Sequence, residues 1–443
     1  MYLDESIYPK EKIELRKDIY EGHPPWERVK KSGLYGRGER RMFSLGCARV
    51  LCDCLAALTF SSQADIYTED ERTRRFILGV LDENSFWENM PAFLSRTYAL
   101  GSGAVRVYMN EGRVCLDFAS AEGFVPLGTH RGRVSDGLFR GIIRRGGKRY
   151  TLLEHHRFEK GRVCIERRLT DRETGEDTDI RAIGLSEREY TECSVPLFAC
   201  FRPKMPDPSK PSLCGESAFE GCIDTIHALD TVFDSLVREF VLGRKRIIVP
   251  SSCIRTVVDP DTGKISRYFD ADDEVYQALC CDDEKDLKIV DNTAVLRVEE
   301  HTDAINALLD ILCFQTGLSA GTLSFSAGGV KTAAEVRSMQ LRTESSMQQY
   351  RALCAEFLED LVQSILACGE MSGEPVRADA HIRISFPDTQ TTDIAEMIDR
   401  NIRLVDAGLR SKAGAVMNIN DCTEDEAEKE LERAEKERRR ENG

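Results

Sequence analysis

The fold is decided by the stretch GLSAGTLSFSAGGVKTAAEVRSMQLRTESSMQQY, residues 317–350, in which a loop composition changes abruptly into a helical pattern. Its first sixteen residues contain four glycines and three serines, which predicts a mobile loop. Thr332 and Glu335 then form a capping box. No Gly or Pro follows until Gly369, so a helix over 332–368 would be about 55 Å long at 1.5 Å per residue. A helix of that length crosses more than one domain or contacts neighbouring subunits.

A long helix, a small module and a shorter helix precede this stretch. Apolar residues recur every three or four positions from Phe219 to Phe240, and Gly243 fits the end of that helix. Short strands and a turn follow, and a helix over 301–314 leads back to the loop. The proline-rich segment 202–211, RPKMPDPSKP, can be neither helix nor central strand, so it is a predicted domain boundary.

The N-terminal half mixes helices with antiparallel strands. Helical spacing covers most of the first hundred residues, and the period changes to two after Gly103. Alternation on both sides of Asn110-Glu111-Gly112 predicts a hairpin, and further alternating segments as far as 169 predict an antiparallel sheet. A strand at 381–386, a helix at 393–407 and a charged helical tail end the chain.

The charge balance and the cysteine spacing exclude several classes of protein. The 443 residues include 61 Lys+Arg and 76 Asp+Glu, a formal charge of −15, which argues against a protein that coats nucleic acid. No stretch is long and apolar enough to cross a bilayer and the start has no signal-peptide core, so we expect a cytosolic protein. The 16 cysteines are scattered without zinc-site spacing.

Local motifs give no support for an enzyme. The segment Gly328-Gly329-Val330-Lys331-Thr332 resembles the end of a phosphate-binding loop, but Val330 separates Gly from Lys. The segment Asp259–Gly263 resembles a calcium loop, but a hairpin turn explains the same residues. His155 and His156 lie on a predicted strand without a nearby carboxylate cluster. We therefore expect no catalytic residue, no cofactor site and no metal site.

Three stretches resemble the portal proteins of tailed bacteriophages, in particular those of siphophages that infect Gram-positive hosts. The first is SAFEGCIDTIHALDTVFDSLVREFVLGRKRIIVP, residues 217–250, which is similar to the helix leading into the family's stem and clip. The second is 317–350, which is similar to the tunnel loop and the helix after it. The third is FPDTQTTDIAEMIDRNIRLVDAGLRSKAGAV, residues 386–416, which is similar to the C-terminal crown segment.

The resemblance implies an α+β portal fold in a ring-forming homo-oligomer. The implied parts are an N-terminal α/β wing domain (1–205), a linker and stem helix (206–246), a small α/β clip module (247–298), a second stem helix (299–316), a tunnel loop (317–331), a long wing or tunnel helix (332–369) and a helical C-terminal crown segment (370–443).

The family also implies a function and a set of partners. Its members form a ring, typically of twelve copies, at one capsid vertex, where the terminase large subunit docks and pumps double-stranded DNA through the channel. Major capsid and scaffolding proteins surround the ring, and a head-completion or adaptor protein joins it to the tail. The protein would assemble in the host cytoplasm and end in the virion, without cofactor, membrane or enzymatic activity of its own.

The candidate DNA-contacting residues follow from the same resemblance. The tunnel-loop candidates are Ser319, Thr322, Ser324, Ser326, Gly328, Gly329 and Lys331. Arg244, Lys245 and Arg246 are candidates for contacts with DNA or a partner, although capping of the preceding helix explains them equally well. Twelve copies at −15 each would carry about −180 formal charges, so a channel wall of that sign would let DNA slide without sticking.

Two other readings stay open at the level of sequence. The first is a phage structural or scaffolding protein that assembles through a coiled coil of the helix 332–368. The second is a phage-associated metal-dependent hydrolase, a nuclease or protease, whose site would be assembled from dispersed acids and histidines.

Overall fold

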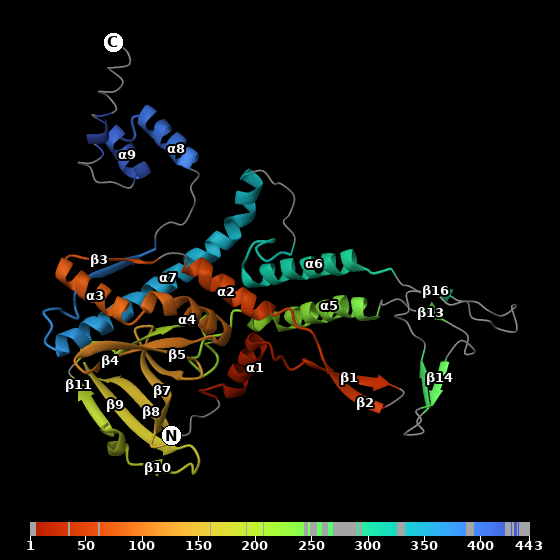
Figure 1. Cartoon of the computed structure of the whole chain (residues 1–443). Coiled ribbons are helices and arrows are strands. Elements are labelled where there is room, and N and C mark those ends of the chain that lie inside the picture. The colour runs from red at the N-terminus through yellow and green to blue at the C-terminus, as the bar shows by residue number, and fades with distance from the viewer. Residues whose placement is uncertain are drawn as a thin grey trace, which may run out of the picture. The chain divides into compact units, whose positions relative to one another are not determined.

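A computed structural model gives the architecture. It describes residues 6–33, 36–60, 63–159, 161–191, 193–206, 208–242, 247–248, 255–258, 265–268, 290–291, 295–325, 333–386, 394–420, 427, 429–431 and 433. The chain splits into two compact units, Met1–Ser385 and Phe386–Gly443, which are treated separately below. Helices and strands are mixed in the first unit, as the sequence predicts for an α+β fold (Figure 1).

Four helices dominate the first hundred residues. They are α1 (Lys10–Glu21), α2 (Cys47–Thr59), α3 (Glu71–Glu83) and α4 (Phe86–Leu100). The carboxylate of Asp70 caps α3 by accepting hydrogen bonds from the backbone N–H groups of Arg72 and Thr73. Between α1 and α2 lies an antiparallel hairpin, β1 (Arg28–Gly33) and β2 (Gly36–Arg41). The helical reading of the first sixty residues was wrong there.

Two antiparallel sheets follow. One has the order β12-β4-β5, and its strands are β4 (Gly103–Asn110), β5 (Arg113–Ser120) and β12 (Phe198–Phe201). The other has the order β10-β9-β8-β7-β6, with β11 also paired to β9. Its strands are β6 (Phe124–His130), β7 (Arg133–Arg145), β8 (Lys148–Glu159), β9 (Arg162–Asp171), β10 (Asp177–Thr178) and β11 (Arg188–Thr191). The predicted hairpin is confirmed, because Glu111 and Gly112 turn between β4 and β5 with φ values of 48° and 79°.

The long helix α7 (Ala333–Met371) supplies the core to which much of the first unit is attached. Its C-terminal half is buried against the three-stranded sheet, α2 and α3, and it carries β17 (Ile382–Ser385) back to pair with β3 (Asp65–Thr68). Its described apolar side chains that are at most 3% exposed are Cys354, Phe357, Leu358, Leu361, Val362, Ile365, Leu366, Ala367 and Cys368. The first unit extends to Ser385, the last residue of β17.

The second unit contains α8 (Ile394–Asp406) and α9 (Lys412–Asn420). Asn401 joins the two helices, because its Nδ2 lies 3.1 Å from Asn418 Oδ1 and its Oδ1 accepts a 2.7 Å hydrogen bond from Arg410. The predicted helix at 393–407 is confirmed within the described residues.

Shortening a buried side chain of α7 should measure how much the burial of this helix contributes to the free energy of unfolding. Leu361 is fully buried, so Leu361→Ala should lower the free energy of unfolding by about 2–5 kcal/mol in denaturant titrations. Leu341 lies on the same helix and is 63% exposed, so Leu341→Ala is the matched control and should change it by less than about 0.5 kcal/mol. Equal losses from the two variants would contradict this account of the core.

His156 on β8 is buried without a hydrogen-bond partner for either ring nitrogen, between Phe139 and Phe198. Burial, together with Arg106, lowers the pKa of its imidazole from 6.5 to about 3. The unfolded chain therefore binds a proton there between about pH 6.5 and pH 3 that the folded chain does not bind, and stability falls as the pH falls through that window.

Replacement of this histidine should stabilise the fold. His156→Leu removes two unsatisfied polar atoms, so it should raise the free energy of unfolding by about 1 kcal/mol at pH 7 and by more near pH 4. The neighbouring His155→Leu is the control and should destabilise, because His155 Nε2 lies 2.7 Å from Asp136 Oδ1. A destabilised His156→Leu variant, or an unchanged pH dependence, would refute the assignment.

Candidate functional site: the stem helices and the loop between α6 and α7

Two antiparallel helices, α5 (Ile223–Leu242) and α6 (Val298–Thr316), form the predicted stem. Hydrogen bonds join the two helices at both ends. Thr225 donates a 2.8 Å hydrogen bond to Gln315, and the guanidinium of Arg297 makes two 3.0 Å hydrogen bonds to the carboxylate of Glu239. The hydrogen bonds of Arg297 keep the pKa of Glu239 below its usual range. The pair is thus held in one register along its length.

The chain leaves α5 and returns to α6 through the predicted clip. Described strands are β13 (Ile247–Ile248), which pairs with β16 (Val290–Asp291), and the hairpin of β14 (Arg255–Val258) and β15 (Ile265–Tyr268). Pairing of β13 with β16 brings the outgoing and returning chain together at the end of the stem. Arg244, Lys245 and Arg246 lie outside the described residues.

The stem helix α5 is also fixed to the N-terminal segment by two carboxylates one helical turn apart. Asp230 accepts hydrogen bonds from Trp26 Nε1 at 2.9 Å, from the Ser44 hydroxyl at 3.0 Å and from the backbone N–H of Leu45 at 2.8 Å. Asp230 is 1% exposed, so its burial is compensated by these donors.

Asp234 makes the second attachment. The guanidinium of Arg40 donates to both of its carboxylate oxygens, at 2.6 and 2.5 Å, and the backbone N–H of Phe43 donates at 3.1 Å. Burial by itself would raise the pKa of Asp234, but the donors outweigh burial and hold that pKa below its usual range. This stabilisation is complete above the usual pKa of the carboxyl group and is lost as the pH falls through the lowered value.

Loss of the contacts of Asp234 should destabilise the protein. Asp234→Asn leaves the Arg40 guanidinium without its charge partner, so it should lower the free energy of unfolding by about 3 kcal/mol near pH 7, with a smaller effect in acid. Asp224→Asn on the exposed side of the same helix is the control, with less than about 0.5 kcal/mol expected. A cost that does not shrink in acid would contradict the ion-pair account.

The first half of the predicted mobile loop, residues 317–325, packs against α6 and α7. Gly317 ends α6 in the left-handed conformation with φ 80°. The backbone N–H of Gly321 donates to Asp310 at 2.9 Å and that of Phe325 donates to Asn306 at 3.2 Å, so the segment runs back along α6. Part of the predicted loop is therefore tied to the helices by hydrogen bonds, and Leu318, Ser319 and Leu323 are buried.

Ser319 is the centre of this anchor. It is 6% exposed, its backbone N–H donates to Thr343 Oγ1 at 2.8 Å, and its hydroxyl lies 3.0 Å from the same oxygen. The side chain of Ser319, which was predicted to contact DNA, is thus hydrogen-bonded to α7 within this chain. No role was predicted for Thr343 from the sequence, and its hydroxyl on an otherwise buried face of the helix is the signal that could have found it.

The other loop candidates are placed differently. Thr322 is half-buried, and its hydroxyl donates to the carbonyl of Ser319 at 2.7 Å. Ser324 is exposed. The remaining candidates, Ser326, Gly328, Gly329 and Lys331, lie outside the described residues.

The structure adds a contact that the sequence did not predict. The guanidinium of Arg342 lies 4.5 Å from the ring centroid of Phe314 and donates a 2.9 Å hydrogen bond to its carbonyl. Arg342 therefore joins α7 to the last turn of α6. The two helices are held together at the ends of the segment that connects them. Phe314 is nevertheless 67% exposed.

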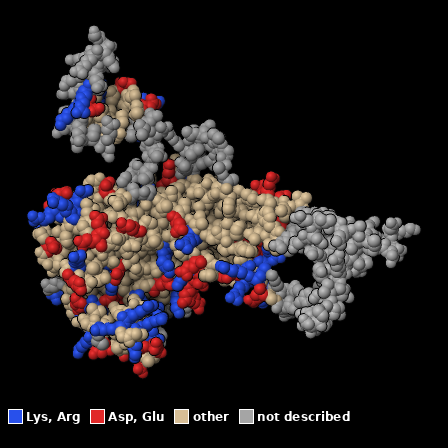
Figure 2. Space-filling model, in the orientation of Figure 1, with Lys and Arg blue, Asp and Glu red and all other residues tan. Residues whose placement is uncertain are grey.

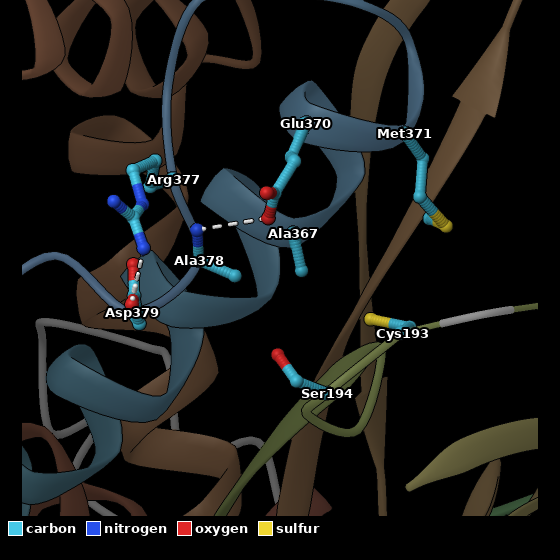
Figure 3. Close-up of a pocket in the computed structure, with 8 residues that line it drawn as sticks. All are labelled: Cys193, Ser194, Ala367, Glu370, Met371, Arg377, Ala378 and Asp379. Atoms are coloured by element: carbon cyan, nitrogen blue, oxygen red, sulfur yellow. Dashed lines mark hydrogen bonds and ion pairs between the residues drawn. The ribbon is translucent and has the colours of Figure 1, made fainter.

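A cavity of about 490 Å³ lies between the end of α7 and the segment Cys193–Ser194 (Figure 3). Its polar groups are engaged with one another: Glu370 accepts a 3.1 Å hydrogen bond from the backbone N–H of Ala378, and Arg377 pairs with Asp379 at 2.8 Å. Burial raises the pKa of the Cys193 thiol, which disfavours a reactive thiolate. We assign no chemistry to this cavity.

Neither a metal centre nor a membrane span is found among the described residues. No group of three or more His, Cys, Asp or Glu side chains there is placed to hold a metal ion. Within the same residues, every helix is too short or too polar to span a membrane.

The described chain is thus a mixed helix and sheet fold in which a pair of antiparallel helices leads through a loop into a long helix. Residues 2–443 match the family described as Phage portal protein, SPP1 Gp6-like, and the chain belongs to that family. No curated protein matches it. The family is structural rather than enzymatic, and membership implies a capsid component that forms an oligomeric ring and associates with capsid and terminase.

Proposed function

We propose that the α5–α6 pair lines a channel for double-stranded DNA, with the clip at one end and the loop at the other. The antiparallel packing of the pair supports this, because it separates the two by the length of α6, about 28 Å for 19 residues at 1.5 Å each. A motor that docks on the clip would then act at a fixed distance from the loop. This separation is the observation that carries the proposal.

The finer partners follow the same geometry. The terminase large subunit docks on the clip and supplies ATP hydrolysis, while this chain performs no catalysis itself. Twelve copies close the ring, major capsid and scaffolding proteins surround it, and a head-completion or adaptor protein binds it after packaging. Assembly takes place in the host cytoplasm, and the ring stays in the virion.

Contact with DNA is assigned to the loop candidates other than Ser319. Thr322, Ser324, Ser326, Gly328, Gly329 and Lys331 keep this role, whereas Ser319 is reassigned to holding the loop. Gly and Ser suit passage of a duplex without base reading, because they offer no side chain that recognises base edges. Arg244, Lys245 and Arg246 bind DNA or a partner, or cap α5.

The alternatives have less support. A coiled coil of α7 would need the apolar stripe of its C-terminal half, which is already buried inside this chain. A metal-dependent hydrolase would need a cluster of ligands, and the described residues contain none.

Removal of the distal loop tests the assignment. Deletion of Ser326–Val330 spares the anchor at Ser319, so rings should form normally while the DNA packaged per prohead in a terminase-driven reaction falls sharply. Thr343→Val is the control for the anchor: it removes the hydroxyl that holds Ser319 but leaves the loop complete, and it should impair packaging less than the deletion does. Normal packaging by the deletion variant would overturn the role given to the loop.

A further inference from the structure

The β1–β2 hairpin differs in charge from the rest of the chain. Six of its residues between 28 and 41 are basic and one is acidic, in a protein with a formal charge of −15. The basic residues are Arg28, Lys30, Lys31, Arg37, Arg40 and Arg41. Figure 2 shows Lys and Arg side chains gathered where the hairpin leaves the body of the molecule.

Its base is fixed by ion pairs, and the described charged side chains next to the base are exposed. Arg40 is used by Asp234, and Arg41 pairs with Glu27 at 3.1 Å. Arg28, opposite Arg41 at the same end, has a 78% exposed side chain that lies 3.7 Å from Glu39, and Lys30, opposite Glu39 and one position farther out than Arg40, is exposed. A two-stranded hairpin is marginally stable by itself in water, so a fixed, protruding hairpin needs a partner surface.

The stem helix α5 separates this hairpin from α6. Thr225 and Glu239 contact α6. On α5, Asp234 instead binds Arg40 of β2, and Asp230 binds Trp26, Ser44 and Leu45 in the segments that flank the hairpin. At 100° per residue the two sets lie about 180° apart around α5. Figure 1 shows the same arrangement, with the hairpin and α6 on opposite sides of α5.

The exposed start of α6 has the complementary charge. Glu299 and Glu300 stand in its first turn, Asp303 follows one turn later, and all three are exposed. This turn lies beside Glu239, which is five residues beyond Asp234 and so about 7.5 Å farther along α5. The hairpin and the acidic turn are therefore at a similar height on opposite flanks of the stem.

In a ring of identical copies, each subunit contacts its two neighbours through two different surface patches. Rotation about the ring axis does not move a residue along that axis, so each residue has the same height in every copy. We propose that the β1–β2 hairpin of one copy docks on the acidic first turns of α6 in the next copy, and that this contact sets the direction of ring closure. The inference rests on the proposed ring and names the surfaces that form it. Opposite charges across such an interface guide association and exclude wrong pairings.

Charge reversal and charge exchange test the contact. Arg28→Glu with Lys30→Glu should raise the protein concentration needed for half-assembly about tenfold at 0.1 M salt, measured by mass photometry. Glu299→Lys with Glu300→Lys should have a similar effect. The chain that carries all four changes should assemble to within about threefold of the wild type. Arg72→Glu with Arg75→Glu, exposed on α3, matches the charge change of the hairpin variant and should leave assembly unchanged.

The possible outcomes distinguish the docking contact from the ring on which it rests. Rescue by the fourfold variant supports the contact, and it also shows that the single reversals did not merely unfold the hairpin. Wild-type rings with unaffected reversal variants would overturn the docking contact but leave the ring intact. Unaffected assembly together with weaker retention of duplex DNA by the hairpin variant would also overturn it and assign the hairpin to DNA. A wild-type chain that forms no ring would overturn both.

Discussion

Burial of the C-terminal half of α7 constrains where most elements of the first unit can lie. The helix packs along the three-stranded sheet and against α2 and α3, and β17 returns from its end to β3. The same helix provides Thr343 and Arg342, which hold the loop and the last turn of α6. Core packing and the placement of the loop therefore both depend on one helix, whose described turns bind the loop and α6 near Thr343 and pack in the core from Cys354 onward.

The stem is attached to this core through polar contacts. Asp230 and Asp234 accept hydrogen bonds from the N-terminal segment, and Arg297 joins α5 to α6. Directional bonds of this kind fix the rotation of a helix about its axis, which apolar burial alone does not fix. For a subunit of a ring that rotation matters, because it decides which residues face the next copy.

The sequence predicted the elements whose pattern is local and regular. The capping box at Thr332, the uninterrupted stretch up to Gly369 and the Asn110-Glu111-Gly112 turn all predicted their elements to within a few residues. The β1–β2 hairpin was missed because its strands, RVKKSG and GRGERR, have no apolar alternation. The buried part of the loop was missed because its partners lie on two helices: Ser319 bonds to Thr343, 24 residues away. Composition describes only the segment itself. A contact such as that between Ser319 and Thr343 depends on tertiary structure, which brings distant parts of the chain together.

The central claim is that this chain forms a closed ring around a channel. Native mass measurement combined with negative-stain electron microscopy of the purified full-length chain tests it most directly. The account predicts particles with a central hole and a mass that is an integer multiple of 49.9 kDa, with ten or more copies. A stable monomer or dimer, or open filaments without a hole, would contradict it.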